Sequence, residues 1–295
     1  MEKKNVLILM EVLNPDEDIF FNDWIKNGYN VSVIFKKVSK PIRAIRRYSL
    51  MKNIGDITIW LGDWFNNLDK YESIIIHMNR LTRYLPEIIS KKCPDMKIIC
   101  WYWNTINKQS EPIKTNNPNI EYFSFDKSDC EKYGLKHNIQ YYCPVKLENT
   151  NKNNDIYFVG RSKGRENQIY DFKNIAESKG LKCNFIIVDD NAINIRPYNE
   201  VKKDLCKTKA VLEINKENQV GFTLRTLESL FYEIKLITDN KEIKKSPIYN
   251  KNNIFIIGED DYDGLFDFIN GEYDTGVNKY RDNYSLDTWF NNFYK

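Results

Sequence analysis

Short apolar runs of strand length alternate along the chain with longer segments whose apolar residues recur at helical spacing. The first such unit is a strand over residues 5–10, a helix over 19–26 and a strand over 29–35. Asp18 is a suitable N-cap for that helix, and Gly28 follows its end. Further strands are predicted at 57–61, 73–77, 97–101 and 120–125. A strand–helix–strand rhythm is typical of a parallel α/β sheet.

The same rhythm starts again after a polar segment. Residues 147–154 contain one apolar residue, Leu147, and form the best candidate linker in the chain. The pattern then predicts strands at 155–159, 182–189, 211–214, 234–238 and 254–257, with helices at 168–178, 198–206, 222–231, 262–269 and 285–294. We therefore expect an α/β fold with two Rossmann-like domains facing each other across a cleft. They would span residues 1–146 and 155–295, and the last helix, 285–295, could return to the first domain.

Composition argues against a nucleic-acid-binding protein, a zinc protein and a membrane-spanning protein. The 295 residues are 42% hydrophobic and 29% charged, which is typical of a globular protein, and the net charge of +3 gives no field of the kind that marks a nucleic-acid binder. The six cysteines form no CxxC pair and there are only two histidines, so a zinc site is not expected. No apolar stretch approaches the ~20 residues that span a bilayer. These features favour a cytoplasmic location.

The segment 36–52 is strongly basic and amphipathic. It holds seven cations and no acid, while Ile42, Ile45, Tyr48 and Met51 recur every three residues. Such a segment can lie on an anionic membrane, which would make the protein peripheral on the inner face of the cell membrane. The alternative is a solvated helix whose apolar stripe packs on its own domain.

The segment 211–239 is predicted to be a strand, a loop, a helix and a second strand. The loop ends at Gly221 and the helix begins around Phe222 and Thr223, with Arg225 in its first turn. A helix N-terminus offers unpaired N–H groups and a partial positive charge, which suit a phosphate. An anion would also offset the cost of placing Arg225 there. The alternative is an ordinary βαβ unit in which Arg225 pairs with Glu228.

A second basic loop lies upstream. The strand at 155–159 runs into Gly160 and is followed by Arg161, Lys163 and Arg165. Both loops follow strands of one parallel sheet, so both can open on the same edge, where they could hold a diphosphate between them. The polar residues Asn218 and Gln219 of the later loop would then contact a sugar or an acceptor.

In the first domain the candidates also follow strands. Glu11 comes after the first strand and His77 ends the strand at 73–77, so each is a candidate base. A structural histidine bonded to a loop is an equally good interpretation of His77. Trp103 and Asn104, at the end of the next strand, could stack on a sugar ring and bind its hydroxyl groups. Aromatic residues at such a position are also ordinary core residues.

Three motifs together resemble the GT-B glycosyltransferases, in particular the large bacterial group with a glycogen-synthase-like donor site. VGRSKGR is similar to that group's strand-end loop, GFTLRTLESL to its helix with a ribose-binding Glu, and IIIHMN to its strand-end His. The resemblance implies that Arg161 and the basic residues after it grip the donor diphosphate, that Glu228 binds the ribose and that His77 contacts the donor sugar. Val220 stands where the group has a further Glu.

The implied activity is metal-independent transfer of a sugar from a UDP- or GDP-linked donor, with no cofactor. The acceptor would be a bacterial surface glycan, such as a capsule, lipopolysaccharide, exopolysaccharide or lipid-linked oligosaccharide. Two alternatives remain open: a sugar-nucleotide epimerase of the same fold, and a catalytically inactive subunit that binds a nucleotide or glycan. A metal-dependent GT-A site at Asp261 and Asp263 is disfavoured, because that pair follows the last strand.

Overall fold

The computed structural model describes residues 1–12, 15, 18–144, 151–188 and 196–295. They divide into two compact units, one made of Met1–Ile139 with Trp289–Lys295 and the other of Gln140–Thr288. The predicted linker, 147–154, lies partly outside the described residues, because 145–150 are not among them. In the part of the chain that the structure describes, no helix is both long and apolar enough to cross a bilayer.

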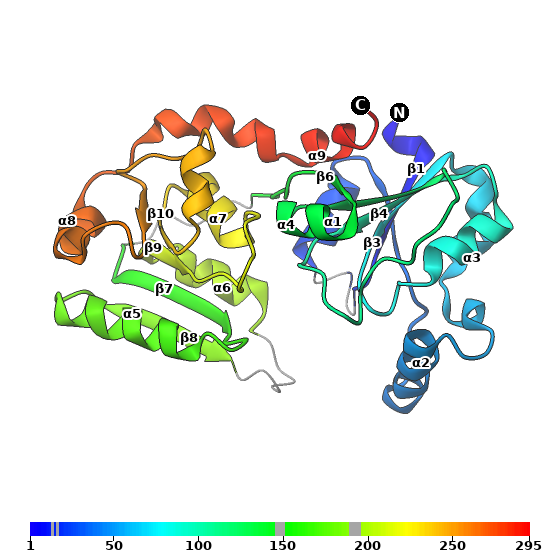
Figure 1. Ribbon diagram of the computed structural model, residues 1–295, viewed down its shortest axis with the longest axis horizontal. Helices are drawn as coiled ribbons and strands as arrows, with labels where there is room; N and C mark the ends of the chain where they lie inside the picture. The colour runs from blue at the N-terminus through cyan, green and yellow to red at the C-terminus, as the bar shows by residue number, and fades with distance from the viewer. Residues whose placement is uncertain (13–14, 16–17, 145–150, 189–195) are drawn as a thin grey trace. The chain divides into compact units, whose positions relative to one another are not determined.

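Unit 1 is built on a six-stranded sheet in the order β2-β1-β3-β4-β5-β6, with every pair parallel. Its strands are β1 (Val6–Met10), β2 (Asn30–Val33), β3 (Ser73–His77), β4 (Lys97–Tyr102), β5 (Ile120–Ser124) and β6 (Lys136–His137). Its helices are α1 (Ile19–Lys26), α2 (Lys40–Lys52), α3 (Leu85–Lys92), α4 (Lys127–Tyr133) and α9 (Leu286–Asn292, assigned by its packing) (Figure 1).

Both faces of this sheet are covered. On one face, side chains of β1, β3 and β4 pack with Leu50 of α2 and Ile89 of α3. On the other face, the ring of Trp289 from α9 lies edge-on to Trp24 of α1 at 5.0 Å and to Trp101 of β4 at 5.6 Å. All three tryptophans are fully buried. The last residues of the chain therefore complete the core of unit 1.

One predicted strand is wrong. Residues 57–61 do not join the sheet; Ile57–Trp60 is a 3₁₀ turn, and Leu61 makes only an isolated bridge to Phe35. The Asp56 carboxyl group accepts the Thr58 N–H at 2.9 Å and its hydroxyl at 2.6 Å, which starts a helical turn. This local cap overrides the β-propensity of the run that follows it.

Unit 2 has a five-stranded parallel sheet in the order β11-β10-β9-β7-β8. Its strands are β7 (Asn154–Arg161), β8 (Cys183–Val188), β9 (Thr208–Glu213), β10 (Lys235–Thr238) and β11 (Ile254–Ile256); its helices are α5 (Glu166–Ser178), α6 (Tyr198–Leu205), α7 (Leu224–Tyr232) and α8 (Leu265–Asn270). Helices α5 and α8 pack on one face and α6 on the other. The predicted α/β class with two doubly wound sheets is confirmed.

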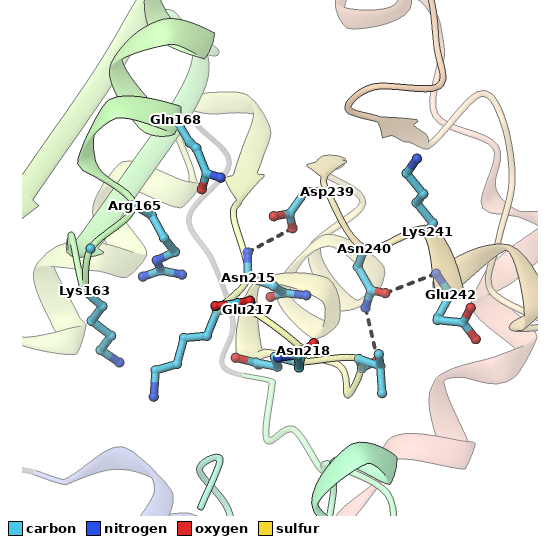
Figure 2. Close-up of a pocket in the computed structure, with 14 residues that line it drawn as sticks. Lys163, Arg165, Gln168, Asn215, Glu217, Asn218, Asp239, Asn240, Lys241 and Glu242 are labelled. Carbon is cyan, nitrogen blue, oxygen red and sulfur yellow. Dashed lines mark hydrogen bonds between the residues drawn. The ribbon is translucent and has the colours of Figure 1, made fainter. Parts of the chain in front are cut away.

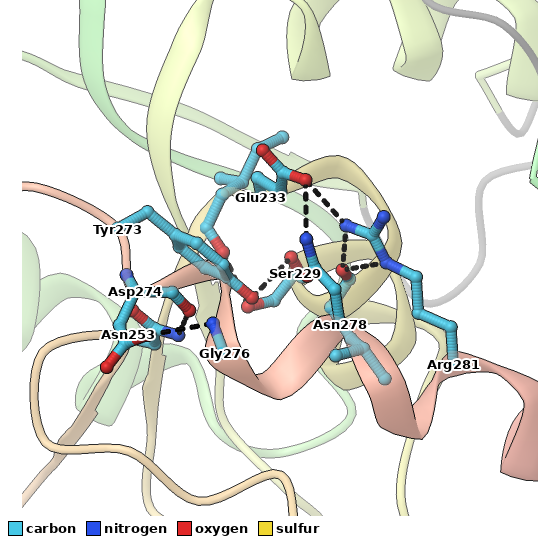
Figure 3. Close-up of polar contacts among 10 residues, drawn as sticks. Ser229, Glu233, Asn253, Tyr273, Asp274, Gly276, Asn278 and Arg281 are labelled. Atoms are coloured by element: carbon cyan, nitrogen blue, oxygen red, sulfur yellow. Dashed lines mark hydrogen bonds and ion pairs between the residues drawn. The ribbon is translucent and has the colours of Figure 1, made fainter.

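A 3₁₀ segment, η7 (Thr275–Tyr284), braces the end of α7 and was missed by the periodicity, which shows no helical repeat there. Arg281 donates to the Leu230 carbonyl and to the Glu233 carboxylate, at 2.8 and 3.0 Å (Figure 3). Asn278 donates to the same carboxylate at 2.8 Å. These bonds satisfy a carbonyl of the last turn of α7, where an unpaired acceptor would otherwise remain.

Candidate functional site

The strand order of unit 2 reverses between β7 and β9. The chain leaves β7 towards β8 on one side and later places β9 on the other side. In open parallel sheets, ligands bind beyond the carboxyl ends of the strands at such a switch point. Arg161 ends β7, the loop after it carries Lys163 and Arg165, and the loop after β9 runs from Ile214 to Thr223. The two loops therefore open on the same edge of one sheet.

Two arginines tie these loops together. Arg165 donates to the carbonyl oxygens of Arg161 and Ser162, each at 3.0 Å, and to that of Ile214 in the other loop. Arg225 donates to the Val159 carbonyl and lies over the Phe158 ring, 5.2 Å from its centre. Both guanidinium groups thus brace the backbone, and each still contributes its positive charge to the edge of the sheet.

The position of the Arg225 side chain accounts for a glycine at residue 160. A Cβ atom at Gly160 would lie 2.8 Å from Nη2 of Arg225, so a side chain at this position would require the guanidinium group to shift. Glycine leaves room for the guanidinium group to approach the end of β7.

A cavity of ≈ 770 Å³ lies between the two loops and the end of β10 (Figure 2). Its lining is polar: Lys163, Gly164, Arg165, Gln168, Asn215, Lys216, Glu217, Asn218, Gln219, Val220, Asp239, Asn240, Lys241 and Glu242. Lys163 and Arg165 come from the β7 side, whereas Asp239 and Asn240 come from the β10 side. Among the described residues of this lining, Val220 is the one aliphatic residue and none carries a ring, so the lining suits a charged, hydroxylated ligand.

Positive charge is concentrated on one side of the cavity. Although solvent reaches Lys163, desolvation by the surrounding protein and the like charges of Lys216, Arg165, Arg225 and Arg161 together lower its pKa to about 8. A cluster of five cations raises the free energy of each charged member. A ligand with two or more negative charges would reduce that repulsion, so the cluster is suited to an anion.

Asn215 provides a second, independent sign of a ligand. Only 7% of the residue is exposed, and neither polar atom of its side-chain amide has a hydrogen-bond partner among the described residues. Its backbone N–H donates to Asp239 at 2.9 Å, which fixes the residue at the cavity wall. A buried amide without partners is costly. A bound ligand with hydroxyl or phosphoryl groups would supply them.

A buried carboxyl group positions the start of α7. Glu213, 1% exposed, accepts hydrogen bonds from the hydroxyl groups of Thr226 at 2.8 Å, Thr238 at 2.7 Å and Thr223. Thr223 also caps α7 by accepting the Arg225 N–H at 3.1 Å. The predicted phosphate contacts Gly221, Phe222 and Thr223 are not in the cavity lining, which ends at Val220.

Phe222 and Glu228, predicted to contact the diphosphate and the ribose, each lie against a tyrosine side chain. The Phe222 ring packs on Tyr284 at 5.8 Å. Glu228 is 5% exposed and accepts the Tyr198 hydroxyl at 2.8 Å. Burial raises the pKa of Glu228 to about 7, while Arg225 and the Tyr198 hydrogen bond lower it. Contact of Glu228 with a ribose stays a prediction, and it would require that Tyr198 move.

In unit 1, Glu11 and Asn79 lie at the corresponding switch point, beyond β1 and β3. Asn79 Nδ2 donates to Glu11 Oε2 at 2.6 Å. Although solvent reaches Glu11, the surrounding protein desolvates its carboxyl group and raises its pKa, against the lowering effects of Asn79, Arg46 and Arg47. A carboxylate with a raised pKa is a better proton acceptor.

The other candidate residues of unit 1 differ in their exposure to solvent. His77 is 9% exposed, lies against the rings of Trp103 and Trp289 at 5.7 and 6.0 Å, and has its pKa lowered by burial to about 3. Trp103 is half-buried and also packs on Phe20, whereas Asn104 is exposed. This environment favours a structural role for His77.

Several residues of the cavity were not singled out from the sequence: Asn215, Lys216, Asp239 and Asn240. Neither was Glu213, which positions the start of α7. Asp239 and Asn240 follow β10 directly, so the rule that points to the carboxyl ends of strands would have found them. Asn240 holds the later loop through a bond from its Nδ2 to the Val220 carbonyl at 3.1 Å.

Comparisons with known proteins give fold likenesses only. No family model matches the chain, and no curated protein does. Among solved structures, the chain is similar to MurG of Acinetobacter baumannii, with 7% identity, a TM-score of 0.38 and 97% of each chain covered. It is also similar to a 5-methylthioribose transporter solute binding protein from Thermotoga lettingae, with 11% identity, a TM-score of 0.26, and 85% of this chain and 74% of that chain covered. A third similar structure is a periplasmic binding ribose operon repressor protein from Lactobacillus acidophilus, with 12% identity, a TM-score of 0.21, and 83% of this chain and 81% of that chain covered. At these TM-scores none of them assigns a function.

Proposed function

We propose that the chain is a glycosyltransferase that binds a nucleoside-diphosphate sugar in the cavity of unit 2. The observation that carries the proposal is the cluster of Arg161, Lys163, Arg165, Lys216 and Arg225 at the β7/β9 switch point. Its charge matches a diphosphate. The remaining polar lining, with the Asn215 amide that has no partner in the described part of the chain, suits sugar hydroxyl groups.

The chemistry follows from the charge that develops on the leaving group. As the bond between the anomeric carbon and the diphosphate oxygen breaks, negative charge grows on the diphosphate. Lys163 and Lys216 line the cavity and would stabilise that charge directly. Arg165, in the same lining, and Arg225 would add their charges while their guanidinium groups hold backbone carbonyls. This assigns the direct contacts to the two lysines and a supporting role to the arginines that brace the loops.

An acceptor hydroxyl must lose its proton as its oxygen bonds to the anomeric carbon. In an inverting transfer Glu11 is our candidate base, because its carboxyl group is reached by solvent and has a raised pKa. His77 is the weaker candidate, since a pKa of about 3 makes it a poor base at neutral pH. We infer that the acceptor is a bacterial surface glycan or its lipid-linked precursor, used at the inner face of the cell membrane.

The test is turnover of UDP- and GDP-sugars by the full chain, with and without glycan acceptors. The Lys163→Met variant should lose at least tenfold in kcat/KM for the donor, since removing one stabilising group of this kind typically costs about 10²–10³. Asn167→Ala, an exposed position on α5 that does not line the cavity, is the matched control. The Glu11→Gln variant should lose roughly 10²-fold or more if transfer inverts.

Other outcomes would identify the alternatives. A change in the donor sugar without any acceptor would show an epimerase. Binding of a nucleoside diphosphate with no turnover of any donor would show an inactive subunit. Absence of nucleoside-diphosphate binding would overturn the proposal.

A further inference from the structure

The outward face of α2 concentrates exposed apolar side chains. The exposed fraction is 43% for Ile42, 62% for Ile45 and 61% for Tyr48 on the helix, and 54% for Ile54 and 55% for Ile59 just after it. Across the described part of the chain, only four other large hydrophobic residues are comparably exposed, and these are scattered: Met1, Ile25, Tyr170 and Phe266. A gathering of this kind marks an interaction surface.

The helix is anchored to unit 1 through its opposite face. Leu50 is 1% exposed and belongs to the core of the unit. Arg46 is 7% exposed, donates to the Lys36 carbonyl at 2.6 Å and lies over the Phe35 ring at 5.1 Å. Most of the apolar stripe predicted from the sequence therefore does not pack on its own domain. Arg46 and Leu50 fill that place instead.

Exposed cations surround the apolar side chains. Those on or next to the helix are Lys36, Lys37, Lys40, Arg43, Arg47 and Lys52. Residues 36–55 contain no acid, and among the residues that the structure describes none of these cations forms an ion pair. The surface, hereafter the α2 surface, consists of these six cations with Ile42, Ile45, Tyr48, Ile54 and Ile59.

We propose that the α2 surface docks on an anionic lipid bilayer, with α2 lying in the interface plane. The cations would pair with anionic headgroups while the isoleucines and Tyr48 enter the boundary between headgroups and acyl chains. A nucleic acid would satisfy the cations but leave the aliphatic side chains in water. A second copy of the chain would bring two sets of six like charges together. The proposal does not depend on the donor site.

Co-sedimentation of the full chain with vesicles tests the proposal. Vesicles of phosphatidylcholine alone are compared with vesicles of phosphatidylcholine and phosphatidylglycerol. The chain should bind the anionic vesicles and be released by high salt. The double variants Arg43→Glu, Arg47→Glu and Ile45→Ser, Tyr48→Ser should each bind at least about tenfold more weakly, the first through charge and the second through lost insertion.

Matched variants elsewhere provide the controls. Lys108→Glu, Lys114→Glu changes two exposed loop lysines of unit 1, and Tyr170→Ser, Phe266→Ser changes two exposed rings of unit 2. Both should bind like the parent. The proposal is overturned if the α2 variants bind like the parent, or if the parent ignores anionic vesicles. It is also overturned if the parent binds nucleic acid, or dimerises, through Ile45 and Tyr48 in place of vesicles.

Discussion

Binding of a nucleoside diphosphate in the cavity of unit 2 should draw a proton onto Lys163. In the unliganded protein, desolvation by the surrounding protein and the four neighbouring cations lower the pKa of this amine to about 8. A diphosphate reverses the sign of the local field, so the pKa should return towards the ordinary 10.4. Between these two values, the free protein carries the neutral amine and the complex carries the ammonium ion.

The size of the effect follows from these two pKa values. Lys163 in the free protein is half-protonated at pH 8, so binding should take up about half a proton there, roughly 0.1 at pH 7 and roughly 0.9 at pH 9. Integrated over this range, the affinity should be about tenfold lower at pH 9 than at pH 7. Because Lys163 is exposed to solvent, which screens its interactions, we express the effect in protons and not as a stability.

Isothermal titration calorimetry in buffers of different ionisation enthalpy measures the uptake directly. UDP and GDP are suitable ligands, because their terminal phosphates, with a pKa near 6, are already ionised across most of this range. The matched control is Lys163→Arg, which keeps the positive charge but does not titrate. That variant should bind with no uptake from this site and with an affinity that changes little between pH 7 and 9.

Two results would refute the reasoning. One is binding at pH 8 with no proton uptake by the parent protein. The other is equal uptake by the parent and by Lys163→Arg, which would place the titrating group elsewhere.

Two further predictions concern the stability of unit 2. Glu213→Ala leaves three threonine hydroxyl groups without their acceptor, so it should lower the free energy of unfolding, measured by urea titration, by about 3 kcal/mol. The control, Glu217→Ala, changes an exposed residue of the adjacent loop and should have little effect. Equal free energies of unfolding for the two variants would contradict the positioning role of Glu213. Burial raises the pKa of Glu228 from 4.5 to about 7, so between these pH values the native state keeps a proton that the unfolded state loses. This carboxyl group should therefore lower the free energy of unfolding by roughly 2–3 kcal/mol between pH 5 and pH 8. Glu228→Gln can still accept the Tyr198 hydroxyl but does not titrate, so its stability should not show this pH dependence. An unchanged pH dependence in the variant would contradict the assignment to Glu228.

The parallel sheets were predictable because each buried strand is an apolar run bounded by polar loops. The exception, Ile57–Trp60, depends on a hydrogen bond from Thr58 to Asp56, which an apolar pattern does not record. The end of the chain was ambiguous for another reason: only tertiary packing shows that Trp289 lies against Trp24 and Trp101.

The candidate site was predictable in place but not in detail. Glycines and cations at and after the ends of β7 and β9 indicated the edge of the sheet at which the cavity lies. Whether a guanidinium faces a ligand or a carbonyl depends on how two loops close on each other, so the bracing roles of Arg165 and Arg225 could not be inferred. The burial of Glu228 beside Tyr198 depends in the same way on the packing of α6 against α7.

A crystal structure of the chain with bound UDP or GDP tests the central claim most directly. The account predicts diphosphate oxygens within hydrogen-bond distance of Nζ of Lys163 or Lys216, in the cavity beyond the carboxyl ends of β7 and β9. Electron density for the nucleotide in unit 1, or anywhere away from these two lysines, would contradict it.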